Sequence, residues 1–442
     1  MERVEKTGTG NVVPTIIPRS QHVISRANIS ENAIKVLYRL KNAGFQAHLV
    51  GGGVRDLLLG REPKDFDVAT DARPEQVREL FRNCRLIGRR FRLAHVHFGQ
   101  EIVEVATFRA SNVEEDSDDR RIENGRIVRD NVYGTIEQDA WRRDFTVNAL
   151  YYNIDDFSVV DYAGGMADLT AGVIRLIGEP VQRYREDPVR MLRAVRFAAK
   201  LGFRIHPDTE APLFELGALL DEISPARLFD ETLKLFLTGC ATTTFTLLRH
   251  YRLFGHLFPL AETALAEEEQ GAPSTFLLRA MGNTDARVAA DKPVTPAFLY
   301  AALLWPAVRR LQRQLHAAGV EAAEILPEAG NQVLADQLRH TTLPKRFSVP
   351  MREIWNLQPR FEHRTGKRPL RLVTHPRFRA TYDFLLLRAE GGEEDVRELA
   401  EWWTRFQSLD SIEQQRLVLL KSGTKRRRRG RRKDEASAPT ED

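Results

Sequence analysis

The chain has 442 residues, of which 42% are hydrophobic and 29% charged, enough for two or three domains of roughly 100–200 residues. This composition excludes a wholly disordered chain, and no apolar run approaches the roughly 18 residues of a membrane span. The first residues lack the apolar core of a signal peptide, and two cysteines are too few for a disulfide framework. We therefore expect a cytoplasmic protein without a transmembrane segment.

The positive charge of the chain is concentrated at its end. Lys and Arg total 66 against 61 Asp and Glu, and residues 421–442 hold nine basic and four acidic residues, which leaves 57 of each sign elsewhere. So basic a run cannot be buried, and it predicts a tail that contacts a polyanion such as RNA rather than one that only increases solubility. The residues predicted to bind RNA are Arg426, Arg427, Arg428, Arg429, Arg431 and Arg432.

The first 180 residues mix helix and strand patterns. Ser30 can cap a helix that Gly44 ends, and a proline opens a second helix over 74–81. Strands are predicted at 45–50, 64–70, 85–88, 93–98 and 102–108, and the last three show period two. The segment 111–125 has almost no apolar residues and predicts a loop.

From about residue 180 the pattern becomes helical, with apolar residues at a spacing near 3.6. The predicted fold class is therefore α+β, a small mixed head followed by a long helical remainder. We expect an extended lead-in, a mixed head, two stretches of the helical remainder and a basic tail. Their ranges are 1–27, 28–155, 156–260, 261–418 and 419–442.

The strongest local signal is LVGGGVRDLLLGREPKDFDVAT, residues 49–70. Three glycines after a strand let the backbone approach a ligand closely, and the helix start that follows suits a phosphate, to which Arg55 can add a charged fork. Asp65 and Asp67 are two residues apart on the predicted strand, so both carboxylates leave the same face and can hold Mg²⁺. Together these features indicate phosphoryl transfer with two metal ions.

A site with two metals usually needs a third carboxylate, and the sequence offers two. Glu104 lies on the strand 102–108, and Asp144 lies in RRDFTVNAL beside Arg142 and Arg143. For Glu104 the alternative is an exposed strand residue. For Asp144 the alternatives are an ion pair with a neighbouring arginine or a contact with the ribose. The sequence alone does not choose between them.

The second strong signal is EDPVRMLRAVRF, in which Arg190, Arg193 and Arg196 form one ridge of a predicted helix. Three guanidinium groups favour an anion between them, such as a triphosphate or an RNA backbone. Asp187, one position beyond the expected start of this helix, offers an acceptor and Arg190 offers donors. Together they can read a base edge without a template. The alternative is a solvated basic face, paired with Glu186 and Asp187.

Two further features are interpreted structurally. His95 and His97 alternate on one strand, but with no third ligand nearby they are read as partly buried strand histidines. Trp402 and Trp403 are predicted to pack a C-terminal helix.

In combination, LVGGGVRDLLLG, DFDVAT, RRDFTVNAL and REDPVRMLRAVRF resemble, in order and spacing, the motifs of the bacterial tRNA nucleotidyltransferase and poly(A) polymerase superfamily. The resemblance implies a polymerase-β-type nucleotidyltransferase head (28–155), a helical neck that reads the nucleotide and binds RNA (156–260), a helical RNA-binding body (261–418) and a disordered basic tail (419–442). It implies that Asp65 and Asp67 are metal ligands and Asp144 a third catalytic acid. It also implies that Gly52, Arg55 and Arg143 contact the nucleotide and that Asp187 and Arg190 face the base. By the same resemblance, Arg193 and Arg196 line the triphosphate.

Two activities share these motifs, the addition of CCA to tRNA and the addition of poly(A) to RNA. Residues 86–96, LIGRRFRLAHV, resemble the signature of bacterial poly(A) polymerases, and the basic tail fits an enzyme that holds varied RNAs by their phosphates. We therefore expect template-independent polyadenylation of RNA 3′ ends with ATP and two Mg²⁺ ions, in RNA decay and with RNA-decay proteins as potential partners. The alternative is a CCA-adding enzyme.

Overall fold

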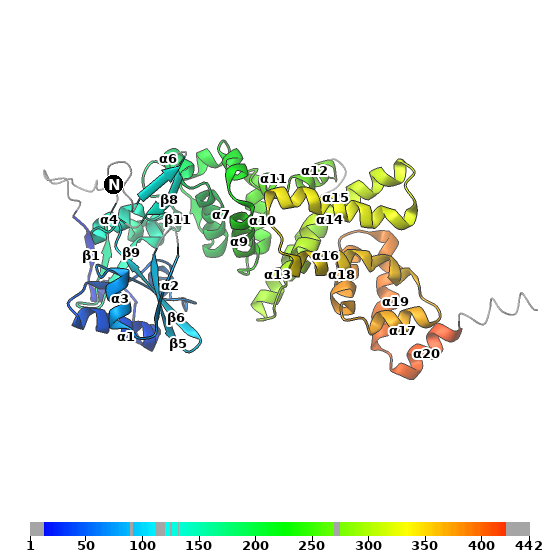
Figure 1. The fold of residues 1–442 in the computed structure, drawn as a ribbon, viewed down its shortest axis with the longest axis horizontal. Coiled ribbons are helices and arrows are strands. Elements are labelled where there is room, and N and C mark those ends of the chain that lie inside the picture. Colours follow the sequence, from blue (N-terminus) through cyan, green and yellow to red (C-terminus); the bar gives the residue numbers. More distant parts are fainter. Residues whose placement is uncertain are drawn as a thin grey trace, which may run out of the picture. The chain divides into compact units, whose positions relative to one another are not determined.

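The structure, a computed structural model, describes residues 13–88, 92–110, 120–123, 126–130, 132–268 and 275–420. The chain forms two compact units, Met1–Leu220 and Asp221–Asp442. The first holds the strands that the structure describes, and the described elements of the second are helical (Figure 1). The predicted α+β head followed by a helical remainder is thereby confirmed. The finer division into neck and body stays a prediction, and Arg426–Arg432 lie outside the described residues.

The first unit is built on an eight-stranded sheet in the order β1-β10-β9-β2-β3-β6-β5-β4. β3 and β6 run parallel, and the other neighbouring strands run antiparallel. The strands are β1 (Thr15–Ile17), β2 (Ala47–Val50), β3 (Asp67–Thr70), β4 (Cys84–Ile87), β5 (Leu93–Phe98), β6 (Glu101–Thr107), β9 (Leu150–Asn153) and β10 (Val159–Asp161).

Two short pairs of strands lie outside this sheet. β11 (Val173–Ile174) runs parallel to β12 (Arg204–Ile205), and β7 (Arg120–Glu123) runs antiparallel to β8 (Arg126–Asp130). The prediction of a loop over 111–125 is therefore wrong for residues 120–123. Their pairing partner, 126–130, follows within a few residues, so a hairpin forms although the segment has few apolar side chains.

The two faces of the sheet differ in cover. Val68, Val105 and Ala94 are buried on one face, and α1 (Glu31–Asn42) and α3 (Pro74–Leu80) pack against these strands. Side chains alternate along a strand, so Asp67 and its neighbours in register point to the opposite face. Asp67 and Glu104 lie on that face, and the Glu104 side chain there is 38% exposed.

The helices of the first unit begin largely where the sequence places them. The Ser30 hydroxyl accepts hydrogen bonds from the amides of Asn32 and Ala33, which confirms the predicted cap of α1. A core of Val50, Ala69 and Tyr151 with α4 lies on the carboxylate face. The remaining helices are α2 (Gly52–Leu58), α4 (Ile136–Arg142), α5 (Gly165–Ala171), α6 (Pro180–Glu186), α7 (Val189–Leu201) and α8 (Pro207–Glu210).

The second unit packs its helices around aromatic side chains. Trp403 is buried, and its indole nitrogen donates to the Phe361 carbonyl at 2.8 Å. Trp402 stacks on Phe406, with 4.7 Å between the ring centres. These contacts confirm the predicted packing role of the two tryptophans. The helices are α9 (Pro225–Phe236), α10 (Ala241–His250), α11 (Phe254–Leu257), α12 (Pro259–Glu268), α13 (Thr275–Ala289), α14 (Pro296–Ala317), α15 (Ala322–His340), α16 (Lys345–Asn356), α17 (Lys367–Val373), α18 (Phe378–Glu390), α19 (Arg397–Ser408) and α20 (Ser411–Leu420).

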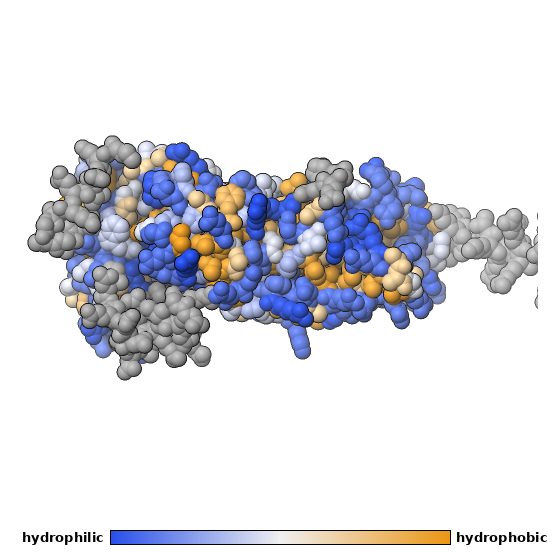
Figure 2. Space-filling view, turned by 90° about the horizontal axis from the view of Figure 1, so that it is seen from above, coloured by the Kyte–Doolittle hydropathy of each residue, from blue (hydrophilic) through white to orange (hydrophobic). Residues whose placement is uncertain are grey.

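The surface agrees with this internal packing. In the space-filling view, hydrophilic residues dominate the visible face of each unit, with small hydrophobic patches between them (Figure 2). None of the helices in the described ranges combines the length and the apolar character needed to cross a bilayer.

Candidate active site

The glycine turn brings three groups together. β2 ends at Val50, and Gly51 is the N-cap of α2. Its φ of 73° is left-handed, a conformation that favours glycine. A Cβ at Gly51 would lie 3.6 Å from Nη1 of Arg143 and 3.9 Å from Oδ2 of Asp67. The bare backbone of Gly51 therefore lies beside both a guanidinium and a carboxylate, as expected where a backbone approaches a ligand closely.

The carboxylate pair does not lie wholly on a strand. β3 begins at Asp67, which pairs with Val50, and Asp65 precedes the strand. The chain of β2 turns away at Gly51, so Asp65 has no strand to pair with, and its carbonyl oxygen packs against Gly53. The expectation that both aspartates lie on one strand is thus wrong for Asp65, which lies two positions before Asp67.

A third carboxylate lies next to Asp67. Glu104 is its register partner on the parallel strand β6, and directly opposed side chains share a face. Burial raises the pKa of Asp67 from 3.8 to about 6, the negative charges of Glu104 and Asp65 raise it too, and Arg143 and His95 oppose the shift. Asp67 is therefore a carboxylate that is costly to ionise without a cation beside it.

The donor set fits a hard cation such as Mg²⁺. Mg²⁺ prefers oxygen ligands and is commonly bound by one or two carboxylates together with substrate phosphates. Asp65, Asp67 and Glu104 supply oxygens only, and burial first, with the negative charges of Glu104 and Asp65, raises the pKa of Asp67. In the described parts of the chain no three His, Cys, Asp or Glu side chains already converge as a ready-made metal cage. Such a site needs oxygens from the substrate as well.

Arg143 is fixed beside these carboxylates. Its Nε and Nη2 donate to Oδ2 of Asp139 at 3.2 and 3.1 Å, and Nε also donates to the Tyr151 hydroxyl at 2.9 Å. Burial opposes its charge, but Tyr151 and Asp139 raise the pKa of Arg143 above its ordinary value. The guanidinium is thus held charged, with Nη1 towards Gly51.

Asp144 is bound to an arginine of α7. Its Oδ2 lies 2.6 Å from Nε and 2.5 Å from Nη2 of Arg193, while Oδ1 accepts from the Phe145 amide and from Asn148. Burial alone would raise the pKa of Asp144, but Arg193 and these hydrogen bonds lower it to about 2. Asp144 thus forms an ion pair, but with Arg193, which lies 49 residues away along the chain, and not with a neighbouring arginine as one alternative held.

Arg55 lies inside the protein, with 2% of its side chain exposed. Nε and Nη2 donate to Oδ1 of Asp56, and Nη1 donates to Oδ1 of Asn148 at 2.6 Å. Since Asn148 also donates to Asp144, Arg55 is linked to the Asp144–Arg193 pair. These contacts hold the Arg55 guanidinium inside the protein, and its predicted contact with a phosphate stays a prediction.

The arginine ridge forms on α7, but Asp187 lies outside that helix. The sequence between α6 and α7 is Asp187-Pro188, and Asp187 is the C-cap of α6 because a residue before proline disfavours helical backbone. The expected position of Asp187 just inside a helix start is therefore wrong. Its backbone carbonyl accepts the amide of Arg190 at 3.0 Å, so the two residues remain adjacent at the start of α7.

The ridge arginines have partners within the protein. Arg190 donates to Glu186 and to the Arg183 carbonyl, as one alternative held. The guanidinium of Arg196 lies 4.5 Å from the centre of the Phe197 ring, and that of Arg193 lies 5.3 Å from it. One aromatic ring thus orders two arginines that the resemblance assigns to the triphosphate.

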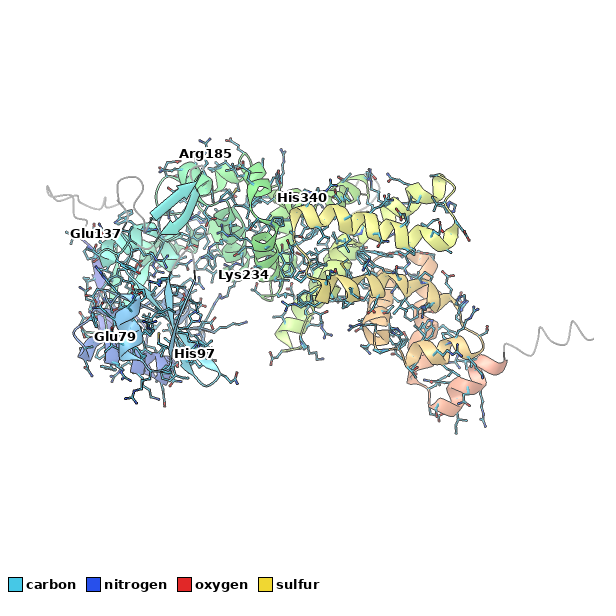
Figure 3. The ribbon with its side chains drawn as sticks, viewed as in Figure 1. Glu79, His97, Glu137, Arg185, Lys234 and His340 are labelled. Atoms are coloured by element: carbon cyan, nitrogen blue, oxygen red, sulfur yellow. The ribbon has the colours of Figure 1, made fainter. Side chains whose placement is uncertain are left out.

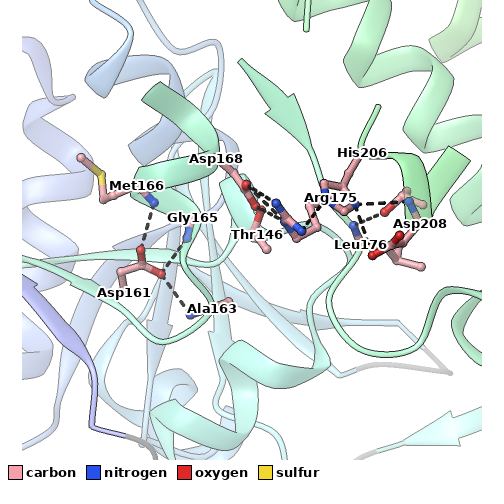
Figure 4. Close-up of polar contacts among 11 residues, drawn as sticks. Thr146, Asp161, Ala163, Gly165, Met166, Asp168, Arg175, Leu176, His206 and Asp208 are labelled. Atoms are coloured by element: carbon pink, nitrogen blue, oxygen red, sulfur yellow. Dashed lines mark hydrogen bonds and ion pairs between the residues drawn. The ribbon is translucent and has the colours of Figure 1, made fainter. Parts of the chain in front are cut away.

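A second network involves the residues that follow Asp144, and Figure 4 shows its contacts among Thr146, Asp168 and Arg175. The Thr146 amide donates to the Arg175 carbonyl, and the Ile177 amide donates to the Asp144 carbonyl. Arg175 forms a two-pronged ion pair with Asp168, whose other contact is the Thr146 hydroxyl at 2.8 Å. The backbone position of Asp144 is therefore set by both neighbouring segments.

Family patterns match three parts of the chain. Residues 47–175 match the "Poly A polymerase head domain", and residues 202–265 match the "Probable RNA and SrmB- binding site of polymerase A". Residues 318–435 match the "Polymerase A arginine-rich C-terminus". The first match contains Asp65, Asp67, Glu104 and Asp144.

Curated relatives match nearly the whole chain. "Poly(A) polymerase I" of Salmonella typhi is 52% identical over 94% of this chain and 91% of its own length. The chain belongs to the bacterial poly(A) polymerase family. The protein of the same name from Haemophilus influenzae is 48% identical over 91% of this chain and 90% of its own length. The family assignment makes the chain a polynucleotide adenylyltransferase. It confirms the preference for a poly(A) polymerase over a CCA-adding enzyme that residues 86–96 and the basic tail suggested.

CCA-adding enzymes are more distant relatives of this poly(A) polymerase family member. The "CCA-adding enzyme" of Lactobacillus helveticus is 39% identical over 46% of this chain and 49% of its own length. Among solved structures, the Bacillus stearothermophilus CCA-adding enzyme in complex with CTP aligns with a TM-score of 0.58 and 26% identity, covering 87% of this chain and 84% of that one. The nucleotidyltransferase fold is thus shared, while the match along the full sequence is to poly(A) polymerases.

Proposed function

We propose that this family member transfers adenylate from ATP to RNA 3′ ends at the carboxylate face of the sheet, without a template. The RNA 3′ oxygen forms a bond to the α-phosphorus, the bond from that phosphorus to the bridging oxygen breaks, and pyrophosphate leaves while the hydroxyl proton passes to solvent. The observation that supports this site most directly is the register of Asp67 with Glu104 beside the glycine turn.

The carboxylates would hold Mg²⁺, with two ions expected. We propose that Asp65, Asp67 and Glu104 are the ligands, because Glu104 shares a face with Asp67 and adds to its negative surroundings. Bound there, Mg²⁺ would supply charge neutralisation and favour loss of the hydroxyl proton. Asp144, the third acid implied by the resemblance, is less suited, because its two oxygens already accept from Arg193, Phe145 and Asn148.

The nucleotide contacts follow from the groups around the turn. Arg143 is held charged beside Gly51, so it is placed to neutralise phosphate charge as pyrophosphate leaves. We assign Gly52 to the same phosphate approach. Asp144 then acts on the nucleotide through Arg193, whose guanidinium it orients, or through the ribose.

The base and the RNA are assigned to other parts of the chain. Asp187 and Arg190 remain the proposed readers of the base edge, and Arg196 joins the triphosphate contacts. The basic residues 426–432 are proposed to hold RNA phosphates, and a role in RNA decay in the cytoplasm, with decay proteins as partners, extends the same proposal.

Single variants of the acids test the site. We expect Asp65→Asn, Asp67→Asn and Glu104→Gln each to lower adenylate transfer by at least about 100-fold, since each removes a charge that acts in the transition state. Asp144→Asn should mainly raise the KM for ATP, with Mg²⁺ dependence unchanged. The opposite result has two parts: Glu104→Gln transfers adenylate at nearly the wild-type rate, and Asp144→Asn binds ATP normally but is inactive. That result would show that Asp144, and not Glu104, is the third ligand.

A further inference from the structure

One row of polar side chains crosses four strands of the sheet. Asp67 on β3 is in register with Glu104 on β6, Glu104 with His95 on β5, and His95 with Arg85 on β4. Residues in register across neighbouring strands point to the same face. The row therefore runs from the proposed metal ligands outward along the carboxylate face to the edge of the sheet.

Within this row His95 contacts Glu104 directly. Nε2 of His95 lies 3.3 Å from Oε2 of Glu104, so the imidazole donates and the carboxylate accepts. The His95 side chain is 22% exposed and that of Glu104 is 38% exposed. His95 thus lies deeper in the protein than the carboxylate it contacts.

His97 provides a natural contrast. It lies on the same strand and the same face, its ring centre is 6.3 Å from that of His95, and its register partner is Ile102 rather than Glu104 (Figure 3 labels His97). The two histidines share residue type, strand and face. They differ in whether the position opposite is a carboxylate.

The contact matters because a glutamate side chain is flexible. It has three rotatable bonds, and ordering them costs conformational entropy. The negative charge of Asp67 on the next strand repels the Glu104 carboxylate and favours rotation of that carboxylate away from the proposed ion. A hydrogen bond from the neighbouring strand counters both effects.

We propose that His95 is a positioning residue that fixes the Glu104 carboxylate beside Asp67 so that the three acids present their oxygens to the metal in one arrangement. The inference rests on the proposed role of Glu104. It also assigns a physical task to one residue of the segment 86–96, whose resemblance to a poly(A) polymerase signature did not specify what its residues do. Partners that orient a metal ligand typically change metal affinity or activity about 10-fold to 100-fold when removed.

The test compares three substitutions in the full chain. His95→Leu removes the donor, His95→Gln keeps an N–H group near the position of Nε2, and His97→Leu is the matched control on the same face. The first readout is the Mg²⁺ concentration that gives half-maximal adenylate transfer at saturating ATP and RNA. The second is Mn²⁺ binding without nucleotide, measured by the electron paramagnetic resonance signal of free Mn²⁺, which does not depend on turnover.

We expect His95→Leu to raise the Mg²⁺ requirement and weaken Mn²⁺ binding about 10-fold, with His95→Gln within about 2-fold of wild type and His97→Leu unchanged. In a Glu104→Gln background His95→Leu should cause no further loss of Mn²⁺ binding. If His95→Leu keeps the metal affinity of wild type while Glu104→Gln is inactive, the positioning role of His95 is overturned. The metal role of Glu104 then still stands. A fully active Glu104→Gln overturns instead the metal role proposed for Glu104. Thermal melting of each variant separates these outcomes from loss of the fold.

Discussion

Replacing Asp67 by asparagine should stabilise the metal-free protein while it destroys activity. The pKa of Asp67 is raised from 3.8 to about 6 in the folded chain, so ionised Asp67 opposes folding. This difference in pKa corresponds to a free energy of unfolding of about 3 kcal/mol. Because solvent reaches part of the side chain, we expect the actual cost to lie between about 1 and 3 kcal/mol. Asparagine carries no charge and removes this cost.

The sign of the pH dependence follows from the same shift. Because the folded pKa of Asp67 lies above its unfolded value, the folded chain binds more protons between about pH 4 and 6, and stability falls as pH rises through that window. Below pH 4 both forms are protonated and the cost vanishes. The stability difference between Asp67→Asn and wild type should therefore be near zero at pH 4 and full above pH 6.

Thermal melting in the presence of EDTA measures this difference. For a unit of 220 residues, the expected gain raises the Tm of Asp67→Asn by roughly 2–10 °C at pH 7.5. Glu79→Gln on the exposed surface of α3 is the control and should leave Tm unchanged. Added Mg²⁺ and ATP should stabilise wild type more than Asp67→Asn. A variant that melts at or below the wild-type temperature at pH 7.5 would refute the electrostatic account of this site.

Three further outcomes follow from the structure. Gly51→Ala should destabilise the chain by about 1–2 kcal/mol in urea unfolding, because its φ of 73° is left-handed, and should raise the KM for ATP; equal stability would contradict that backbone geometry. Asp144→Asn and Arg193→Gln should show a coupling energy of about 1 kcal/mol or more in a double-mutant cycle of unfolding, and additive effects would contradict their pairing. Deletion of residues 421–442 should weaken RNA binding and flatten its salt dependence without changing the KM for ATP, and an unaltered salt slope would exclude the tail from RNA contact.

Local features were predictable because local chemistry determines them. The cap at Ser30, the helix opened by Pro74 and the turn at Gly51–Gly53 each depend on a few adjacent residues, and the structure has all three. The start of α7 after Pro188 also follows from a local rule, but Asp187 was expected just inside that helix. Applying the restriction on residues before proline would have placed it correctly.

The composition of the site was not predictable to the same degree, because strand register is a long-range property. Nothing near Glu104 in the sequence specifies that β6 pairs in parallel with β3, and this pairing alone brings Glu104 beside Asp67. The bond from His95 to Glu104 has the same origin, which is why His95 was read as a strand histidine without a functional role. Asp144 was ambiguous for a related reason, since Arg193 approaches it from α7.

The most direct test of the central claim is extension of a labelled single-stranded RNA with Mg²⁺ and each of the four nucleoside triphosphates separately. The account predicts a long ladder with ATP alone, which Asp67→Asn abolishes. No extension of that RNA, with two C and one A added to a tRNA lacking its 3′ end, would contradict polyadenylation and establish a CCA-adding activity.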